Sequence, residues 1–263
     1  MELSPAARAF DSIAEGFDAR FTPWLSVAAQ RRAVRSALVT AFTPGSRLIE
    51  LGGGTGDDAM WMADRGFDVL MTDPSPAMVR TAAGKFAGRA GLAAQVAPAE
   101  NLGVVDGHYD GAWSNFAGLN CVTDLAPVAK ELARLLRPGA PAILVVFGSH
   151  CPGEMLVEGL RGRPRNMFRR FRRGPVSAKL NGHDFTVRYH RVGDLVAAMK
   201  PWFASAGRQG IGVFVPPSAA EPWISCHPRL LAGLEALDGA LATPLAAFGD
   251  HILYRFVRTG MAA

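Results

Sequence analysis

The chain has 263 residues, of which 49% are hydrophobic and 19% charged, and its formal net charge is +5. This length is enough to bury a core without a disulfide or metal staple, and three widely spaced cysteines without a C-x-x-C pair exclude a disulfide scaffold and a zinc module. The first residues lack a secretory leader and the longest interior apolar run, residues 142–147, is too short for a spanning helix. We therefore expect a soluble protein of the reducing cytoplasm.

Residues 1–42 predict a helical cover, because Phe10, Ile13, Phe17 and Phe21 recur at helical spacing and Pro23 separates two helices. From residue 47 onward, strand and helix patterns alternate. The expected strands are 47–51, 67–72, 92–96, 109–114 and 141–147, and the expected helices are 57–65, 78–86 and 125–136. This alternation predicts a parallel sheet with helices on both faces.

Beyond residue 147 the alternation is interrupted. We expect a hairpin around Asn181-Gly182, a helix over 193–203, and strands over 209–215 and 251–258. The prediction is a single α/β domain, doubly wound around a seven-stranded, mostly parallel sheet. Its parts are a cover (1–42), a cofactor-binding core (43–147), two insertions that together form a lid (148–190 and 216–248), and the rest of the sheet (191–215 and 249–258).

A glycine-rich turn joins the first expected strand to the first core helix. Gly52, Gly54 and Gly56 allow a ligand to approach the backbone closely, and the helix beyond them offers unpaired N–H groups. The spacing departs from the G-x-G-x-x-G dinucleotide fingerprint, and Asp57 and Asp58 at the helix start would repel a pyrophosphate. A cofactor with a cationic centre fits this turn better.

Glu50-x-Gly52-x-Gly54-x-Gly56, followed by Asp73 at the end of the second strand, resembles the class I S-adenosylmethionine-dependent methyltransferases. The chain is most similar to small-molecule members like the ubiquinone/menaquinone methyltransferases. Further similar segments are residues 10–18, 75–78, 99–102 and 131–139. The resemblance implies a Rossmann-like methyltransferase fold, an enzyme that uses S-adenosylmethionine and releases S-adenosylhomocysteine, a small-molecule acceptor, and no metal.

The resemblance also implies roles for single residues. The glycine turn would line the methionine moiety, and Asp73 would accept hydrogen bonds from both ribose hydroxyls, since a carboxylate presents two acceptors. Met78 would lie against adenine and Ala99 would offer its N–H to it. Before Ala99 this chain has Pro98 where the family commonly has aspartate, so Glu100 or a backbone carbonyl is expected to substitute. The predicted cofactor-binding residues are Phe17, Glu50, Gly52, Gly54, Gly56, Asp73, Met78, Ala99, Glu100 and Ser114.

The resemblance leaves the catalytic residues open. Acceptors in such sheets sit beyond the carboxyl ends of the strands, so Asn115, after the fourth strand, is a candidate polar orienter. His150, after the fifth strand, and His190, after the hairpin, are candidate bases, and a structural histidine is the alternative for each. No two histidines have metal-ligand spacing. Residues 114–116 are not the Asn/Asp-Pro-Pro-aromatic motif of amino-directed nucleic-acid methyltransferases, which argues against a nucleic-acid partner.

Residues 161–173 hold seven arginines and no acid, and without them the charge balance becomes −2. Three interpretations stay open for this segment. It is a solvated lid helix that packs Met167, Phe168 and Phe171 on the core, a site for an anionic substrate, lipid headgroup or membrane surface, or an RNA contact. Trp223 either lines an apolar acceptor pocket or anchors the second insertion. The cysteines are expected to be small buried hydrophobes.

We therefore predict S-adenosylmethionine-dependent methyl transfer to a small, hydrophobic or aromatic acceptor at oxygen or nitrogen, with carbon kept open, by a monomer or homodimer. One alternative is a tRNA, rRNA or lipid-headgroup methyltransferase that uses the arginines of residues 161–173. The other is a catalytically inactive S-adenosylmethionine-binding partner subunit.

Overall fold

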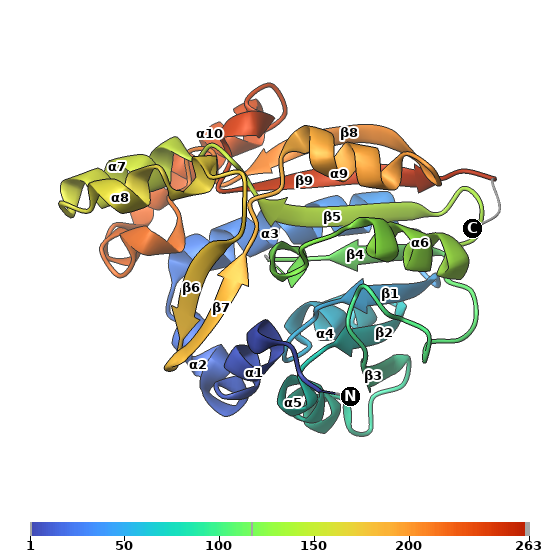
Figure 1. Ribbon diagram of the computed structural model, residues 1–263. Helices are drawn as coiled ribbons and strands as arrows, with labels where there is room; N and C mark the ends of the chain where they lie inside the picture. Colours follow the sequence, from blue (N-terminus) through green and yellow to red (C-terminus); the bar gives the residue numbers. More distant parts are fainter. Residues whose placement is uncertain (1, 117, 261–263) are drawn as a thin grey trace.

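The computed structural model describes residues 2–116 and 118–260. Its centre is a seven-stranded sheet with the order β3-β2-β1-β4-β5-β9-β8 (Figure 1). The strands of this sheet are β1 (Arg47–Leu51), β2 (Asp68–Asp73), β3 (Leu92–Val96), β4 (Gly111–Ser114), β5 (Pro141–Phe147), β8 (Phe203–Ile211) and β9 (His251–Arg258). β1 to β5 pair in parallel, and β9 pairs antiparallel with both β5 and β8. The predicted seven-stranded, mostly parallel sheet is confirmed.

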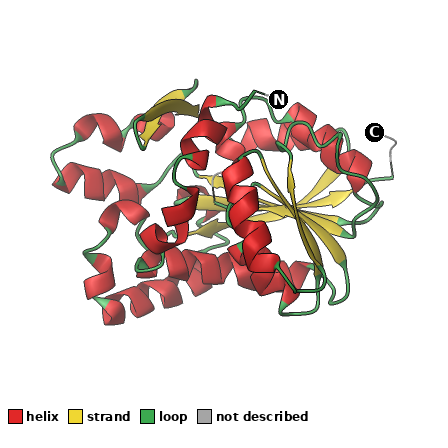
Figure 2. Cartoon of the chain, turned by 90° about the horizontal axis from the view of Figure 1, so that it is seen from below, coloured by secondary structure: helices red, strands yellow, loops and turns green. Residues whose placement is uncertain are grey.

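Helices cover both faces of this sheet, which Figure 2 shows from below. The helices are α1 (Pro5–Asp11), α2 (Phe17–Phe21), α3 (Leu25–Ala41), α4 (Asp57–Ala63), α5 (Pro76–Phe86), α6 (Ala126–Leu135), α7 (Pro152–Leu160), α8 (Pro164–Met167), α9 (Val192–Met199) and α10 (Pro228–Leu241). Leu132 of α6 and Leu195 of α9 belong to the core on one face, and Leu38 of α3, Met62 of α4 and Ala82 of α5 to the core on the other. Because helices cover both faces of the sheet, β1, β4 and β5 are buried along almost their whole length.

Two helices, α1 and α5, begin with the same N-terminal capping signal. The Ser4 and Ser75 hydroxyls accept hydrogen bonds from the backbone N–H groups of Ala7 and Met78, each 3.1 Å away. A proline follows each serine, where the missing N–H costs nothing and the fixed φ favours the first helical turn. These caps set where α1 and α5 start, and both helices border the site described below.

One pair of predicted boundaries is wrong. The helix expected over 193–203 ends at Met199, and the strand expected over 209–215 is β8, which begins at Phe203. Pro201 follows the helix end, and proline cannot continue an α-helix because it lacks an N–H and clashes with the preceding turn. β8 is an edge strand with an exposed run over residues 204–208, so it lacks the apolar alternation that reveals a strand.

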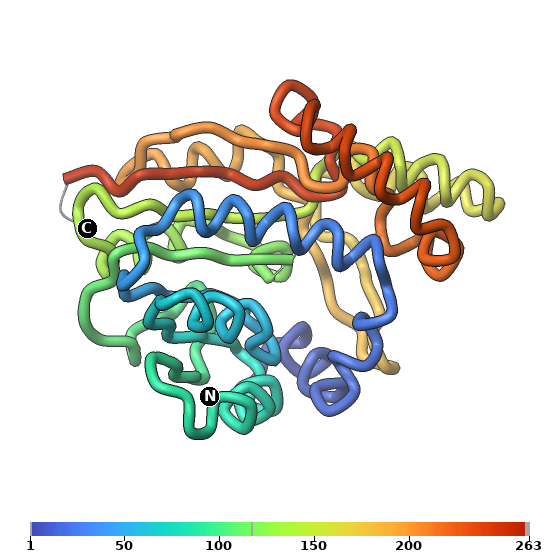
Figure 3. Tube along the Cα trace, turned by 180° about the vertical axis from the view of Figure 1, so that it is seen from behind, coloured from blue at the N-terminus to red at the C-terminus, as the bar shows by residue number. Residues whose placement is uncertain are grey.

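The two insertions touch where α7 of the first packs on the short helix η4 (Ser218–Ala220) of the second, but their other parts lie in different places. In the first, β6 (Val176–Leu180) and β7 (His183–Val187) form the expected hairpin around Asn181 and Gly182, both at positive φ. This hairpin lies beside α1, where the Phe10 and Phe185 rings are 6.0 Å apart (Figure 1). In the second, α10 packs near α3 on the back of the molecule (Figure 3). Of the two, the first insertion is the one with residues at the cavities described next, so the predicted joint lid is not what the structure shows.

Candidate active site

Two adjoining cavities lie at the carboxyl ends of the parallel strands. The inner cavity has a volume of about 120 Å³ and the outer one about 620 Å³. They share the lining residues Ser4, Ala6, Glu100, Cys121 and Val122. The inner cavity alone is smaller than the about 300–1,000 Å³ of most small-molecule sites, and the outer cavity adjoins it at these shared residues. Predicted residues that line the inner cavity are Phe17, Gly52, Gly54, Asp73, Met78, Ala99, Glu100 and Ser114.

The glycine turn has the left-handed backbone that its sequence predicts. Gly52, Gly54 and Gly56 have φ values of 66°, 58° and 81°, a region that strains other residues. Gly52 and Gly54 bring their backbone to the inner cavity. Gly56 instead packs on Phe86, because a Cβ there would lie 2.5 Å from the Phe86 ring. The third glycine therefore serves the packing of α4 against α5 and does not line the cavity.

Asp73 closes β2 and holds the glycine turn in place. Its Oδ2 accepts a hydrogen bond from the Gly54 N–H at 2.9 Å, and its Oδ1 accepts one from the Ser75 N–H at 2.8 Å. Burial raises the pKa of Asp73 to about 6, even though both hydrogen bonds lower it. No ion pair to this carboxylate occurs within residues 2–116 and 118–260. Each oxygen keeps acceptor capacity toward the cavity, which suits the two hydroxyls of a diol.

Ser114, at the end of β4, faces the same cavity. Its Oγ is buried and has no hydrogen-bond partner among the described residues. An unpaired buried hydroxyl costs about 1–3 kcal/mol, so a ligand that donates a hydrogen bond here would relieve that cost. The Asp73 carboxylate can accept hydrogen bonds from the ribose hydroxyls of S-adenosylmethionine, and the Ser114 hydroxyl can accept one from its ammonium group. Both residues line the inner cavity beside the glycine turn.

Two acids of the N-terminal cover, neither of them a predicted site residue, attach it to the core, Asp11 at the start of α5 and Asp18 at the glycine turn. Asp11 Oδ1 accepts hydrogen bonds from the Ser75 hydroxyl and from the backbone N–H of Ala77, both at 2.8 Å. Asp18 accepts one from the Thr55 hydroxyl at 2.6 Å. Both acids directly follow a phenylalanine of the cover pattern, which was the available signal. This attachment places Phe17 of α2 over the inner cavity.

Glu50 lies beneath the glycine turn and does not line either cavity. Its Oε1 accepts a hydrogen bond from Trp113 Nε1 at 3.0 Å, while its Oε2 is buried without a partner among the described atoms. A Cβ on Gly53 would come within 2.7 Å of that Oε2, so the turn packs directly on the carboxyl group. Burial and the nearby carboxylate of Asp58 raise the pKa of Glu50 well above its usual value.

The carboxylates at the start of α4 are neutralised by neighbours that the sequence did not reveal. Asp57 pairs with Lys85 at 2.7 Å and Arg31 at 3.1 Å, and these cations lower its pKa although burial raises it. Asp58 pairs with Arg35 at 2.7 Å and accepts a hydrogen bond from the Asn115 amide at the same distance. Asn115 is thus occupied in the protein interior and does not line either cavity.

The two candidate bases also lie outside the cavities. His150 is exposed, with Nδ1 2.9 Å from the Ser149 hydroxyl and its ring edge-to-face with Phe171. His190 Nε2 lies 3.2 and 3.0 Å from the carbonyl oxygens of Leu119 and Val122, and burial lowers the pKa of His190. The structure therefore supports the structural alternative for both histidines.

A third histidine, His251, contacts a residue that lines the inner cavity without lining it itself. It begins β9, whose antiparallel direction puts this residue at the carboxyl edge of the parallel strands. Its ring stacks on Phe147 at 4.6 Å and meets, at 5.3 Å, the ring of Phe116, which lines the inner cavity. Gln30 donates its amide N–H to Asp250, so its carbonyl oxygen accepts from His251 Nδ1 at 3.1 Å. The neutral ring then keeps its proton on Nδ1, and sequence alone gave no signal for this arrangement.

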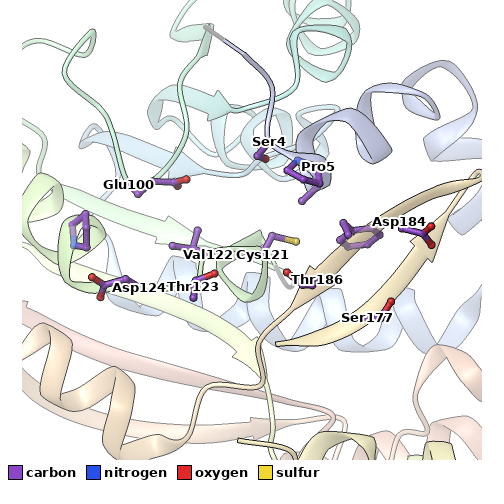
Figure 4. Close-up of a pocket in the computed structure, with 13 residues that line it drawn as sticks. Ser4, Pro5, Glu100, Cys121, Val122, Thr123, Asp124, Ser177, Asp184 and Thr186 are labelled. Carbon is purple, nitrogen blue, oxygen red and sulfur yellow. The ribbon is translucent and has the colours of Figure 1, made fainter. Parts of the chain in front are cut away.

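Carboxylates surround the mouth of the outer cavity. Glu100, Asp124 and Asp184 line it, together with apolar side chains such as Pro5 and Val122 (Figure 4). Cys121 borders both cavities, and burial together with the nearby carboxylates raises its pKa to about 12. The expectation that all cysteines are buried hydrophobes holds for Cys151 and is wrong for the exposed Cys226.

Residues 161–173 do not form one helix with an apolar face on the core. Arg170 is buried, whereas Phe168 and Phe171 are exposed. Trp223 is 58% exposed and stacks on His227, so it neither lines a cavity nor sits buried as an anchor. Within residues 2–116 and 118–260, no three His, Cys, Asp or Glu side chains are grouped to hold a metal ion, and none of the helices has the length and apolarity to cross a membrane.

Comparisons with known proteins agree with this geometry. Residues 48–139 match the family described as a methyltransferase domain. A methyltransferase from Listeria monocytogenes superposes with a TM-score of 0.62 at 16% identity, covering 88% of this chain and 98% of that one. One from Mesorhizobium loti superposes with a TM-score of 0.56 at 20% identity, with the same coverages of 88% and 98%. Both are S-adenosylmethionine-dependent, and both share the fold. The chain therefore has a methyltransferase domain over residues 48–139 and the fold of these S-adenosylmethionine-dependent methyltransferases.

The chain also matches part of several curated methyltransferases. The chain is 38% identical over 108 residues to a ubiquinone/menaquinone biosynthesis C-methyltransferase of Acidiphilium cryptum, covering 40% of this chain and 43% of the relative. It is 35% identical over 119 residues to a demethylmenaquinone methyltransferase of Beutenbergia cavernae, covering 45% and 47%. The chain thus spans about half the length of these relatives.

Proposed function

We propose that this protein transfers a methyl group from S-adenosylmethionine to a neutral, largely apolar small acceptor. The observation that carries the proposal is that two buried polar groups, the Asp73 carboxylate and the Ser114 hydroxyl, line the inner cavity beside the glycine turn. Among the described residues, the carboxylate has no ion pair and the hydroxyl no hydrogen-bond partner. S-adenosylmethionine supplies a methyl group on a sulfonium centre that an acceptor displaces directly.

In this proposal the chain's own residues bind and enclose the cofactor. Asp73 accepts hydrogen bonds from the ribose hydroxyls, and Ser114 with the Gly52 backbone accepts them from the ammonium group. Phe17 and Met78 form apolar walls of the inner cavity, where they exclude water from the reacting atoms. Much of the rate enhancement then comes from holding donor and acceptor in line.

The outer cavity supports a neutral acceptor over an anionic one. Glu100, Asp124 and Asp184 at its mouth repel carboxylates and phosphates, and low-polarity walls strengthen that repulsion. This disfavours RNA and phospholipid headgroups as acceptors. The same carboxylates are positioned to take up a proton that an acceptor loses. Because two relatives are named for quinone methylation, a hydroxylated aromatic ring is the first acceptor to test, with ring carbon or oxygen as the methylated atom.

The test uses S-adenosylmethionine with an isotopically labelled methyl group and a panel of acceptors. The panel contains benzoquinols and naphthoquinols that lack a ring methyl group, a fatty amine, a malonyl thioester and bulk tRNA, and mass spectrometry identifies the product. We expect label in a quinol, and much less of it with Asp73→Asn at equal, subsaturating cofactor concentration. Label in tRNA, or in the malonyl thioester with its free carboxylate, would contradict the proposal. Tight S-adenosylhomocysteine binding without transfer to any acceptor would support the inactive partner subunit instead.

A further inference from the structure

An arm of the first insertion extends beyond the sheet after the end of β5. It consists of α7, α8 and the short helix η3 (Arg169–Phe171), and we name residues 152–173 the arginine arm. Figure 1 shows α7 and α8 reaching away from the strands, and Figure 3 shows the same segment at the edge of the molecule from behind. None of the arm's residues lines either cavity of the active site.

One arginine, Arg170, anchors the arm to the core, and another, Arg169, ties two parts of the arm together. The buried Arg170 pairs with Glu154 at 2.5 Å and with Asp250 at 2.6 Å, and it donates to the Gly148 and Asp250 carbonyl oxygens. Arg169 forms two hydrogen bonds to Glu154, at 2.8 and 2.9 Å. A bidentate arginine pair and a buried ion pair hold the backbone of η3 in one geometry. The arm is therefore a fixed surface of the protein.

Large apolar side chains of the arm point into solvent. Leu160 is 82% exposed, the highest fraction among the large apolar side chains that the structure describes, and Leu156, one turn earlier, is 64% exposed. Phe168 is 53% exposed, and its ring lies 6.1 Å from that of Phe171, which is 39% exposed. Adjacent exposed apolar side chains on one short segment are typical of an interaction surface.

The other five arginines of the arm belong to the same short segment as these side chains, and all are exposed. They are Arg161, Arg163, Arg165, Arg172 and Arg173. Arg161 lies 3.5 Å from Glu158. The other four form no ion pair within the part of the chain that the structure describes. Four uncompensated cations therefore stand beside four exposed apolar side chains, while the chain outside residues 161–173 carries a balance of −2.

We propose that the arginine arm docks the protein on an anionic phospholipid surface. Leucine and phenylalanine side chains enter the boundary between headgroups and acyl chains, and arginines beside them meet the lipid phosphates. An RNA surface fits less well, because exposed leucines stack on no base. The inference goes beyond the proposed function and needs no turnover for its test. It does give a route for a lipophilic acceptor, which would dissolve in the bilayer that the arm contacts.

The test is cosedimentation with vesicles of phosphatidylcholine alone and with vesicles that also contain phosphatidylglycerol. A basic variant carries Arg163→Gln, Arg165→Gln, Arg172→Gln and Arg173→Gln. An apolar variant carries Leu156→Gln, Leu160→Gln and Phe168→Gln. A control variant removes the same number of positive charges elsewhere on the surface, with Arg80→Gln, Lys200→Gln, Arg208→Gln and Arg229→Gln. All substituted side chains are exposed, and those of the basic and control variants are also charged. The variants are therefore expected to fold.

We expect binding only to the anionic vesicles, weakening as salt rises. Each arginine at an anionic surface is worth about fivefold in binding, so the basic variant should lose at least a hundredfold while the control variant loses far less. The apolar variant should also bind more weakly. Absent binding by the unaltered protein, or an equal loss in the control variant, would overturn the proposal. Binding to tRNA but not to vesicles, lost in the basic variant, would make the arm an RNA surface.

S-adenosylhomocysteine binding and methyl transfer to a dispersed quinol are measured in parallel on every variant. Both should be unchanged in the basic variant, because the arm does not line the cavities. Failure of the docking proposal would show only in the vesicle measurement. Failure of the proposed function would show only in the transfer measurement.

Discussion

Cofactor affinity should depend on pH through a single carboxyl group, Asp73. Its pKa in the ligand-free protein is about 6 because it is buried, so it is largely a carboxylate at pH 8 and largely protonated at pH 5. A carboxylate accepts hydrogen bonds from a diol at both oxygens, whereas a protonated carboxyl group carries a competing O–H. Ligand binding therefore favours the deprotonated form, and affinity falls as the pH drops through about 6.

The magnitude follows from the distance between the pH and the pKa. One pH unit below the pKa, about ten protonated proteins stand for each deprotonated one, so the dissociation constant should rise about tenfold between pH 8 and pH 5. Asp73→Asn keeps the shape but offers one acceptor and no charge. It should weaken binding at pH 8 by about 2 kcal/mol, or roughly thirtyfold, since a hydrogen bond to a charged group is worth about 1.5–3 kcal/mol against 0.5–1.5 for a neutral one.

Isothermal calorimetry with S-adenosylhomocysteine at pH 5, 6, 7 and 8 would measure both effects without turnover. The matched control is Asp68→Asn, an exposed aspartate at the opposite end of the same strand. The control should keep the affinity and pH profile of the unaltered protein, and Asp73→Asn should show a flat profile. An unaltered affinity in Asp73→Asn, or an unchanged pH profile in that variant, would refute the assignment of Asp73 to the ribose.

Three further substitutions test separate parts of the site. Gly56→Ala places a Cβ against the Phe86 ring in addition to the strain of its φ of 81°, so it should lower the free energy of unfolding in urea by about 2–4 kcal/mol. Gly139→Ala, which has a similar φ but open space around it, should lower it by about 1 kcal/mol, and equal losses would exclude the packing role. Arg170→Met leaves the buried Asp250 without its arginine, while Glu154 keeps Arg169, and it should cost about 3–5 kcal/mol by the same measurement. A loss below about 1 kcal/mol would contradict the anchoring role. Ser114→Ala removes a hydroxyl that has no partner among the described residues, so the free energy of unfolding should stay the same or rise. Calorimetry should show about five- to tenfold weaker cofactor binding. Reduced stability with unchanged binding would contradict the proposed contact.

The sequence by itself determined the core of the fold and the site of the cofactor. β3, β5 and β9 have the predicted boundaries, because apolar runs and turn residues are local properties of the chain. Positive φ at Gly52 and Gly54 follows from the same kind of local signal. Since parallel strands all end at one edge of the sheet, the positions of Asp73 and Ser114 beside the glycine turn could be predicted too.

The tertiary structure alone decided which polar groups are free to act. Asn115 was a candidate orienter until Asp58, 57 positions away in the chain, occupied its amide. Arg170 belongs to a segment that looked solvated, yet Asp250, 80 positions away, pairs with it inside the protein. His251 lies at the carboxyl edge of the parallel strands only because β9 is antiparallel to its neighbours. Burying a charge or an amide is costly unless a partner is present, and no local pattern reveals a partner that long-range folding supplies.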